Sequence, residues 1–154
     1  LSGDVYVTYR EREYDDPQLQ DVDGWGLGAG LHWMPTTLTS VHANVSTSIE
    51  DTTQASSSGY FRTMYSLRAD HELLRDLQIM AQISYYVNDY QLLPTAPEGA
   101  REEDTMWTGD IGATYFFNRS VWLSASYKYS NFSTNVQNDD FTANTAWLVL
   151  GLER

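Results

Sequence analysis

The sequence predicts an all-β fold, an up-and-down meander of eight antiparallel strands. Two observations carry this prediction: apolar and polar residues alternate with a period of two in eight segments, and the connectors between these segments alternate in length. The chain has 154 residues, enough for one domain, and nothing in its composition marks a second one. We therefore treat residues 1–154 as a single β-barrel domain.

Each strand is predicted from its own alternation, and the clearest runs from Trp25 to Trp33, where odd residues are apolar and even residues are glycine or histidine. A helix would spread this pattern around its circumference, whereas a strand places it on two faces. The predicted strands are residues 4–13, 25–33, 40–49, 59–70, 77–90, 105–117, 121–131 and 143–152. Besides the second strand, their apolar parity is carried in chain order by Val5, Val7 and Tyr9; Val41, Ala43, Val45 and Ile49; Phe61, Tyr65 and Leu67; Leu77, Ile79, Ala81, Ile83, Tyr85 and Val87; Trp107, Ile111, Ala113, Tyr115 and Phe117; Leu123, Ala125, Tyr127 and Tyr129; and Ala146, Leu148, Leu150 and Leu152.

The connectors are the second sign of a meander. Long polar connectors at residues 15–24, 51–58, 91–104 and 132–142 alternate with shorter ones at 35–39, 71–76 and 118–120. In a meander, alternate connectors lie at opposite ends, so the long ones gather at one end and the short ones at the other. This layout is typical of bacterial outer-membrane barrels, in which long loops are extracellular and short turns and termini are periplasmic.

Aromatic residues on the apolar parity favour lipid as the environment of that face. Trp25 and Trp33 bracket the second predicted strand, and Trp107 and Phe117 bracket the sixth. Ten residues at about 3.3 Å each, tilted by about 40°, span roughly 25 Å along the membrane normal, the height of the apolar band of such a barrel. We therefore expect contact with outer-membrane lipid and lipopolysaccharide through two aromatic girdles, formed by Trp25, Trp33, Trp107, Tyr115, Phe117, Tyr127 and Tyr129.

The opposite parity carries polar and charged residues that we expect to line a lumen. If residues 118–120 form a hairpin loop, Phe117 faces Val121, and the same register places Asp110 opposite Lys128, where an ion pair is expected. The same argument across residues 35–39 places His32 opposite His42. The predicted lumen-facing residues are Arg10, Arg12, His32, His42, Arg62, Arg68, Asp110 and Lys128.

Composition excludes several classes of function. A formal net charge of -12 disfavours a nucleic-acid partner, and the absence of cysteine removes disulfides and thiolate metal sites. No segment approaches the roughly 18 consecutive apolar residues of a transmembrane helix. His32 and His42 have no third ligand nearby in the sequence, and no Ser, His and acid group converges, so we expect no metal, no cofactor and no enzymatic activity.

The C-terminal half contains several distinctive sequence phrases. They are His71-Glu72-Leu73-Leu74-Arg75-Asp76-Leu77 before a strand that ends Asn88-Asp89-Tyr90, Gly112-Ala113-Thr114-Tyr115-Phe116-Phe117-Asn118-Arg119, Tyr127-Lys128-Tyr129-Ser130, Phe141-Thr142-Ala143-Asn144 and Leu148-Val149-Leu150-Gly151-Leu152. With these phrases the chain resembles the putative beta-barrel porin 2 family over roughly residues 59–152. The resemblance implies an outer-membrane porin of Gram-negative bacteria, often linked to exopolysaccharide export with a periplasmic export partner. It also implies a longer barrel, of which this chain would be the C-terminal part.

Three hypotheses remain open from the sequence. The eight strands are part of a wide pore that passes a polymer or small solutes, or they close on themselves as a structural or adhesive protein with a filled lumen. A soluble ligand-binding barrel would show the same alternation, with the apolar face turned inward. The length of the parent chain and the side on which the apolar face lies would distinguish these hypotheses.

Overall fold

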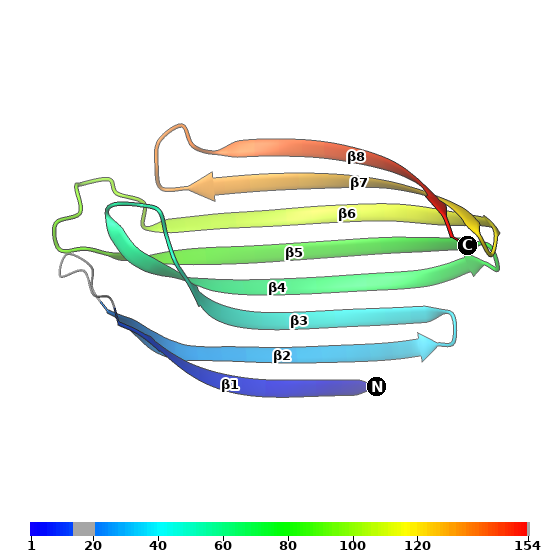
Figure 1. Cartoon of the computed structure of the whole chain (residues 1–154), viewed down its shortest axis with the longest axis horizontal. Coiled ribbons are helices and arrows are strands. Elements are labelled where there is room, and N and C mark those ends of the chain that lie inside the picture. Colours follow the sequence, from blue (N-terminus) through cyan, green and yellow to red (C-terminus); the bar gives the residue numbers. More distant parts are fainter. Residues whose placement is uncertain (14–20, 154) are drawn as a thin grey trace.

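The computed structural model describes residues 1–13 and 21–153, apart from the side chain of Arg12. Its described part is a single sheet of eight strands in sequence order, shown in Figure 1, and all eight predicted strands are confirmed. All of them are longer than predicted, since regular pairing continues past the ends of the apolar runs. The strands are β1 (Ser2–Arg12), β2 (Val22–Thr36), β3 (Thr39–Glu50), β4 (Ser57–Leu74), β5 (Leu77–Leu92), β6 (Glu103–Asn118), β7 (Val121–Thr134) and β8 (Phe141–Leu152).

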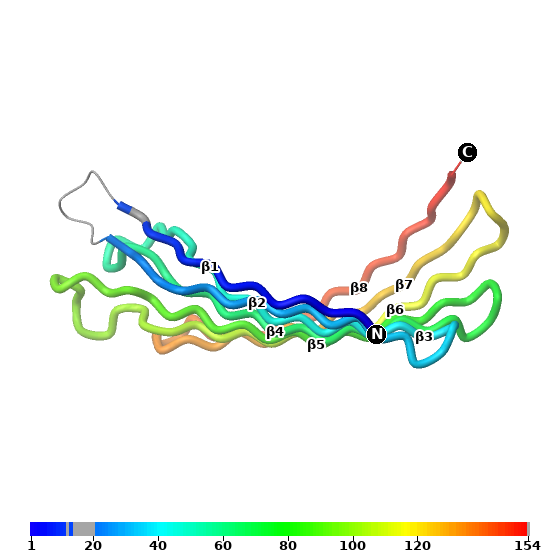
Figure 2. Tube along the Cα trace, turned by 90° about the horizontal axis from the view of Figure 1, so that it is seen from below, coloured from blue at the N-terminus to red at the C-terminus, as the bar shows by residue number. Residues whose placement is uncertain are grey.

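Every strand pairs antiparallel with its neighbour in the sequence, so the topology is the predicted up-and-down meander. Within the described residues, β1 pairs with β2 alone and β8 with β7 alone, which leaves the sheet open (Figure 1). Figure 2 shows that the sheet is curled. The long-connector end of β1 and the C-terminal end of β8 lie at diagonally opposite corners of the sheet, and both rise to the same side. This is the curl of a barrel wall whose strands are tilted to the barrel axis.

The two ends of the sheet differ as predicted. Two-residue turns at 37–38, 75–76 and 119–120 close one end, whereas the longer connectors, including 51–56, 93–102 and 135–140, lie at the other. Ser2 pairs with His32, and Leu152 pairs with Val121, so both termini of the described sheet lie toward the short-turn end.

One detail of the predicted register is wrong. Asn118, and not Phe117, pairs with Val121, because the register shifts between Phe116 and Asn118 just before the turn. Comparable irregularities precede the other two short turns. An irregularity of this kind absorbs one residue and sharpens the bend, so pairing beyond it returns to the predicted alternation.

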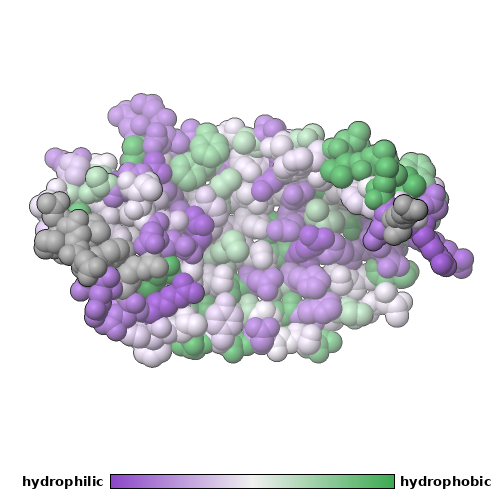
Figure 3. All heavy atoms as spheres, viewed as in Figure 1, coloured by the Kyte–Doolittle hydropathy of each residue, from purple (hydrophilic) through white to green (hydrophobic). Residues whose placement is uncertain are grey.

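The apolar parity is the more exposed one, which is the reverse of a soluble barrel. In β6, for example, Trp107, Ile111, Tyr115 and Phe117 are exposed, while the residues between them are partly covered. Figure 3, which looks onto the concave side, shows hydrophilic residues gathered over the middle of the sheet and hydrophobic ones near its margins. The polar parity therefore lines the concave side, and the apolar parity faces outward.

Buried side chains are few, and they lie near the long-connector end. The buried apolar residues of the described chain are Val22, Ile49, Leu93, Ala100 and Phe132, and none of its side chains is fully buried. A sheet without a conventional core needs an apolar solvent, or further protein, on its outer face. Among the described residues there is no helix of the length and apolarity required to cross a membrane.

Candidate pore-lining surface

A belt of polar side chains crosses the middle of the concave face. Cross-strand pairing places one residue from each of the strands β2 to β7 side by side: His32 next to His42, His42 next to Arg68, and so on to Lys128. This row brings together five of the residues predicted to line a lumen, which come from five different strands. We call it the central belt, and its members are His32, His42, Arg68, Gln82, Asp110 and Lys128.

The histidine pair at one end of the belt is confirmed as a cross-strand pair. The imidazole rings of His32 and His42 stack with centroids 4.3 Å apart and an interplanar angle of 7°. Among the described residues, no group of three or more His, Cys, Asp or Glu side chains is placed to hold a metal ion.

The middle of the belt is organised by an ion pair within one strand. Arg68 donates from Nε and Nη2 to the two carboxylate oxygens of Asp70, at 2.8 and 2.7 Å. A two-point pair of this geometry fixes both planar groups and neutralises their charges. The pair borders a polar depression of about 520 Å³ on the concave face, lined by His42, Asn44, Ser66, Arg68, Asp70 and Gln82.

Asp110 and Lys128 are cross-strand neighbours, as the register predicted. The expected ion pair between them is absent, however, because none of the ion pairs within 4.0 Å among the described residues joins these two side chains. Asp110 Oδ1 is buried and has no hydrogen-bond partner within the described part of the chain. Register fixes which residues are adjacent, whereas the rotamers of a long lysine side chain decide whether the charges meet.

Arg62 lies on the same face, nearer the long-connector end. Its guanidinium stacks on the rings of Tyr60 and Tyr86, at 5.3 and 4.8 Å from the centroids, and Nε donates to Asn88 Oδ1 at 2.9 Å. These contacts hold the arginine flat against the wall. The remaining predicted residues are less informative: Arg10 pairs with Gly24 near the sheet edge, and the side chain of Arg12 lies outside the described residues.

A clamp between two long connectors borders the concave face, and sequence analysis missed it. Arg101 pairs with Asp104 at 3.1 Å and also with Asp139, and so joins the β5–β6 and β7–β8 connectors. Asn135 reinforces the clamp, since its Oδ1 accepts from the Glu102 amide at 2.9 Å and its Nδ2 donates to the Ala100 carbonyl at 2.7 Å. Burial tends to lower the pKa of Arg101, but the Asp104 carboxylate outweighs it, and the pKa stands above the usual value.

The clamp gives Asp104 and Asp139 a structural role. Asp104 is only 2% exposed and also accepts from the Tyr90 hydroxyl at 2.8 Å, so it acts as an internal anchor. Asp104 and Asp139 are thus compensated within the protein. Sequence gives no periodic signal for such a contact between two connectors.

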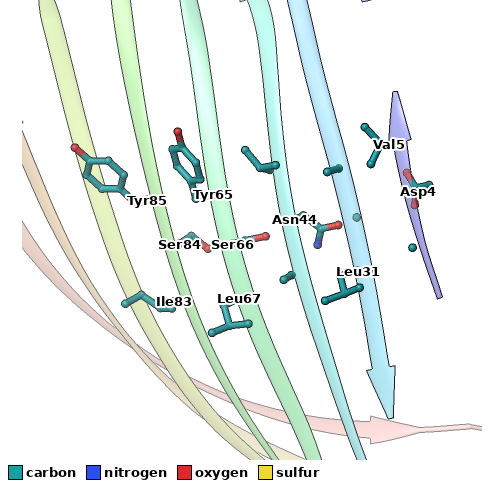
Figure 4. A pocket seen from close by; sticks show the side chains of 15 residues that line it. Asp4, Val5, Leu31, Asn44, Tyr65, Ser66, Leu67, Ile83, Ser84 and Tyr85 are labelled. Atoms are coloured by element: carbon teal, nitrogen blue, oxygen red, sulfur yellow. The ribbon is translucent and has the colours of Figure 1, made fainter. Parts of the chain in front are cut away.

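The predicted girdle residues all lie on the outer, apolar face. Trp25 and Trp107 lie toward the long-connector end of their strands, and Trp33, Tyr115 and Phe117 lie toward the short-turn end. Tyr127 and Tyr129 are nearer mid-strand. Between the two ends, Figure 4 shows Tyr65 and Tyr85 side by side on adjacent strands, above Leu31, Leu67 and Ile83, around an apolar groove of about 700 Å³.

An antiparallel meander with apolar side chains outward and polar side chains along its concave side is the architecture of a membrane β-barrel wall. The chain belongs to the putative beta-barrel porin 2 family, whose model matches residues 1–154. The match extends the resemblance seen in the C-terminal half to the whole chain, and membership suggests an outer-membrane location. No curated protein and no solved structure shows a significant match.

Proposed function

We propose that this chain forms part of the wall of a wide outer-membrane pore, with its long connectors extracellular and its short turns and termini periplasmic. The observation that carries the proposal is the polar concave face of an open sheet whose apolar parity faces outward. Backbone groups at an open edge would lack partners in lipid, so β1 and β8 would have to pair with further strands of the same barrel. Such a barrel would be wider than one closed from eight strands.

The proposed cargo is polar, and the family resemblance favours an exopolysaccharide handed over by a periplasmic export partner. The central belt and the serines beside it offer hydroxyl, amide and charged groups to a hydrated polymer. Outer-membrane lipid and lipopolysaccharide would contact the outward face. The proposal contains no chemical step, so the protein would act as a conduit and not as an enzyme.

The two other hypotheses predict different surfaces. A soluble ligand-binding barrel would bury its apolar parity, yet Leu148 is 72% exposed and Ile111 is 61% exposed. A closed eight-stranded protein would pair β1 with β8 and fill its lumen with side chains, whereas these strands form opposite edges of the described sheet.

The proposal is tested by reconstituting the protein in liposomes and measuring swelling with neutral sugars of increasing size. We expect uptake of solutes larger than a filled eight-stranded barrel would admit. Impermeable liposomes that contain inserted, heat-modifiable protein would contradict the pore. A monodisperse monomer in the absence of detergent would contradict the membrane location itself.

A further inference from the structure

Three rows of side chains run across the concave face in register, and they differ sharply in size and chemistry. The first is the central belt. Two residues away from it on each strand, toward the long-connector end, lies a row of small residues, here called the serine row. Its members are Gly30, Asn44, Ser66, Ser84, Thr108 and Ser130. Two residues further again lies a bulky row, here called the aromatic row, with Tyr6, Met64, Tyr86, Met106, Phe132 and Phe141 as its large members.

Because the middle row is small and its neighbours are large, the three rows form a transverse furrow. Strand residues rise about 3.3 Å each, so the backbones of the two outer rows are roughly 13 Å apart. Serine, threonine and asparagine side chains form the floor of this furrow. The depression of about 520 Å³ described above opens onto it at Asn44 and Ser66.

The two walls of the furrow offer complementary chemistry. The belt wall carries planar hydrogen-bonding groups, and Arg68 with Asp70 forms a pair whose charges cancel. On the opposite wall, the aromatic row presents rings and thioethers. Arg62 covers Tyr86 from the side away from the furrow, since Arg62 pairs with Asn88, two residues beyond Tyr86.

The furrow retains its bulky wall even where a strand supplies a glycine. Gly28 belongs to the aromatic row, but the ring of Tyr6 from β1 lies across it and occupies that position. At the other edge of the sheet, Phe132 and Phe141 stack with centroids 5.0 Å apart and continue the wall to β8. The wall thus runs from β1 to β8, with one gap at β3, where Ser46 is its small member.

We propose that this furrow is a binding site for the rings of a neutral oligosaccharide. A sugar ring has apolar C–H faces and a rim of hydroxyl groups, so one wall would stack against it while the other wall and the floor exchange hydrogen bonds with it. The charges of Arg68, Asp70, Asp110 and Lys128 sum to zero, and Asp4 beside Gly30 adds one negative charge at the β1 end, so the furrow favours an uncharged ligand over a polyanion. The inference rests on the proposed function, because the furrow must face the pore to meet such a ligand.

The experiment is calorimetric titration of the protein in detergent micelles with maltohexaose, a linear neutral oligosaccharide. Glucose, an oligogalacturonate and a poly(ethylene glycol) of similar size serve as parallel probes. We expect maltohexaose to bind more tightly than glucose, because several rings would occupy the furrow together. The oligogalacturonate and the poly(ethylene glycol) should bind at least about tenfold more weakly, since one is charged and the other has no ring.

Four variants locate the site. Ser84→Phe fills the floor and should abolish binding, and Tyr86→Ala removes a stacking surface and should weaken it about tenfold. Tyr86→Phe keeps the ring and should bind as the parent protein does. Ser126→Phe adds the same bulk as Ser84→Phe on the concave face but beyond the far side of the belt, and it should not alter binding.

Heat-modifiable gel mobility would show that each variant is folded. Absence of maltohexaose binding, or equal binding by Ser84→Phe and Ser126→Phe, would overturn the proposed site. The swelling assay is read separately: swelling without oligosaccharide binding would reject the furrow and leave the pore, whereas lack of swelling would reject the pore whatever the titration shows. Equal affinity for glucose and maltohexaose would identify a site for a single sugar ring and would also overturn the proposal for an oligosaccharide.

Discussion

The ring of Tyr6 lies directly over Gly28, its cross-strand partner, so closely that a β-carbon at position 28 would overlap the ring. Tyr6 is 49% exposed beside an open edge, so it can swing away when displaced, but only by giving up this contact. We expect Gly28→Ala to cost about 1–3 kcal/mol of unfolding free energy. Denaturant titration in micelles, monitored by gel mobility, measures the cost.

A second glycine provides the control for this prediction. A β-carbon at Gly109 would have no neighbour nearer than 4.0 Å, so Gly109→Ala should be tolerated. Adding Tyr6→Ser to Gly28→Ala should remove most of the penalty. If the penalty remained in the double variant, the cost would lie in the backbone of β2 and not in the ring.

The two faces of the sheet should respond differently to charge. Leu148 lies on the outer face of β8 and is 72% exposed, whereas Ser126 lies on the concave face of β7. We expect Leu148→Arg to destabilise the folded protein in lipid by about 2–4 kcal/mol, because an arginine would enter the apolar band. Ser126→Arg should cost much less, and equal costs in denaturant titration would mean that the faces are assigned wrongly.

Asp110 and Lys128 are adjacent without meeting, which limits how strongly they can stabilise each other. A double-mutant cycle with Asp110→Asn and Lys128→Met should therefore give a coupling energy within the range of about 0.2–1 kcal/mol that exposed pairs show. Asp110→Asn alone should be tolerated, since Asp110 Oδ1 is buried with no hydrogen-bond partner among the described residues. A coupling of several kcal/mol would show that the two charges form a contact in lipid.

The connector clamp gives a prediction outside the membrane. Removing Arg101 leaves Asp104, 2% exposed, with a buried charge and the Tyr90 hydroxyl as its remaining side-chain partner among the described residues. We expect Arg101→Gln to cost about 3 kcal/mol and to expose residues 93–102 to proteolysis. Asp139 is 49% exposed on the other side of the same arginine, so Asp139→Asn should cost less than about 1 kcal/mol. Similar proteolysis of Arg101→Gln and Asp139→Asn would contradict the larger effect expected for the arginine variant.

The fold could be predicted from the sequence because the two faces of each strand meet different environments. That difference produces period-two alternation, and the short turns then determine the register of adjacent strands, as for His32 with His42. The irregularity before Val121 could not be predicted, since it depends on how the turn and the strand twist are reconciled.

The site was only partly predictable, for two physical reasons. Adjacency follows from register, but the rotamers of Lys128 and Asp110 depend on all neighbouring charges, and their ion pair was wrongly expected. The Arg101 clamp joins connectors that have no periodicity, so no local pattern points to it. The furrow needs the register of every hairpin at once, because a shift of one residue in a single strand would exchange its two faces.

The meander also has a kinetic consequence. Every pairing in the described sheet joins strands that are consecutive in the chain, and each short turn closes over two residues. Loop closure of that kind has a small entropic cost, so each hairpin can form as soon as its own residues are available. The slow event would be the pairing of the two outer edges, since no short turn guides β1 or β8 to a second partner in the described sheet. Until that step the backbone groups of both edges are open to other chains, so the assembly rate should depend on how these edges are protected.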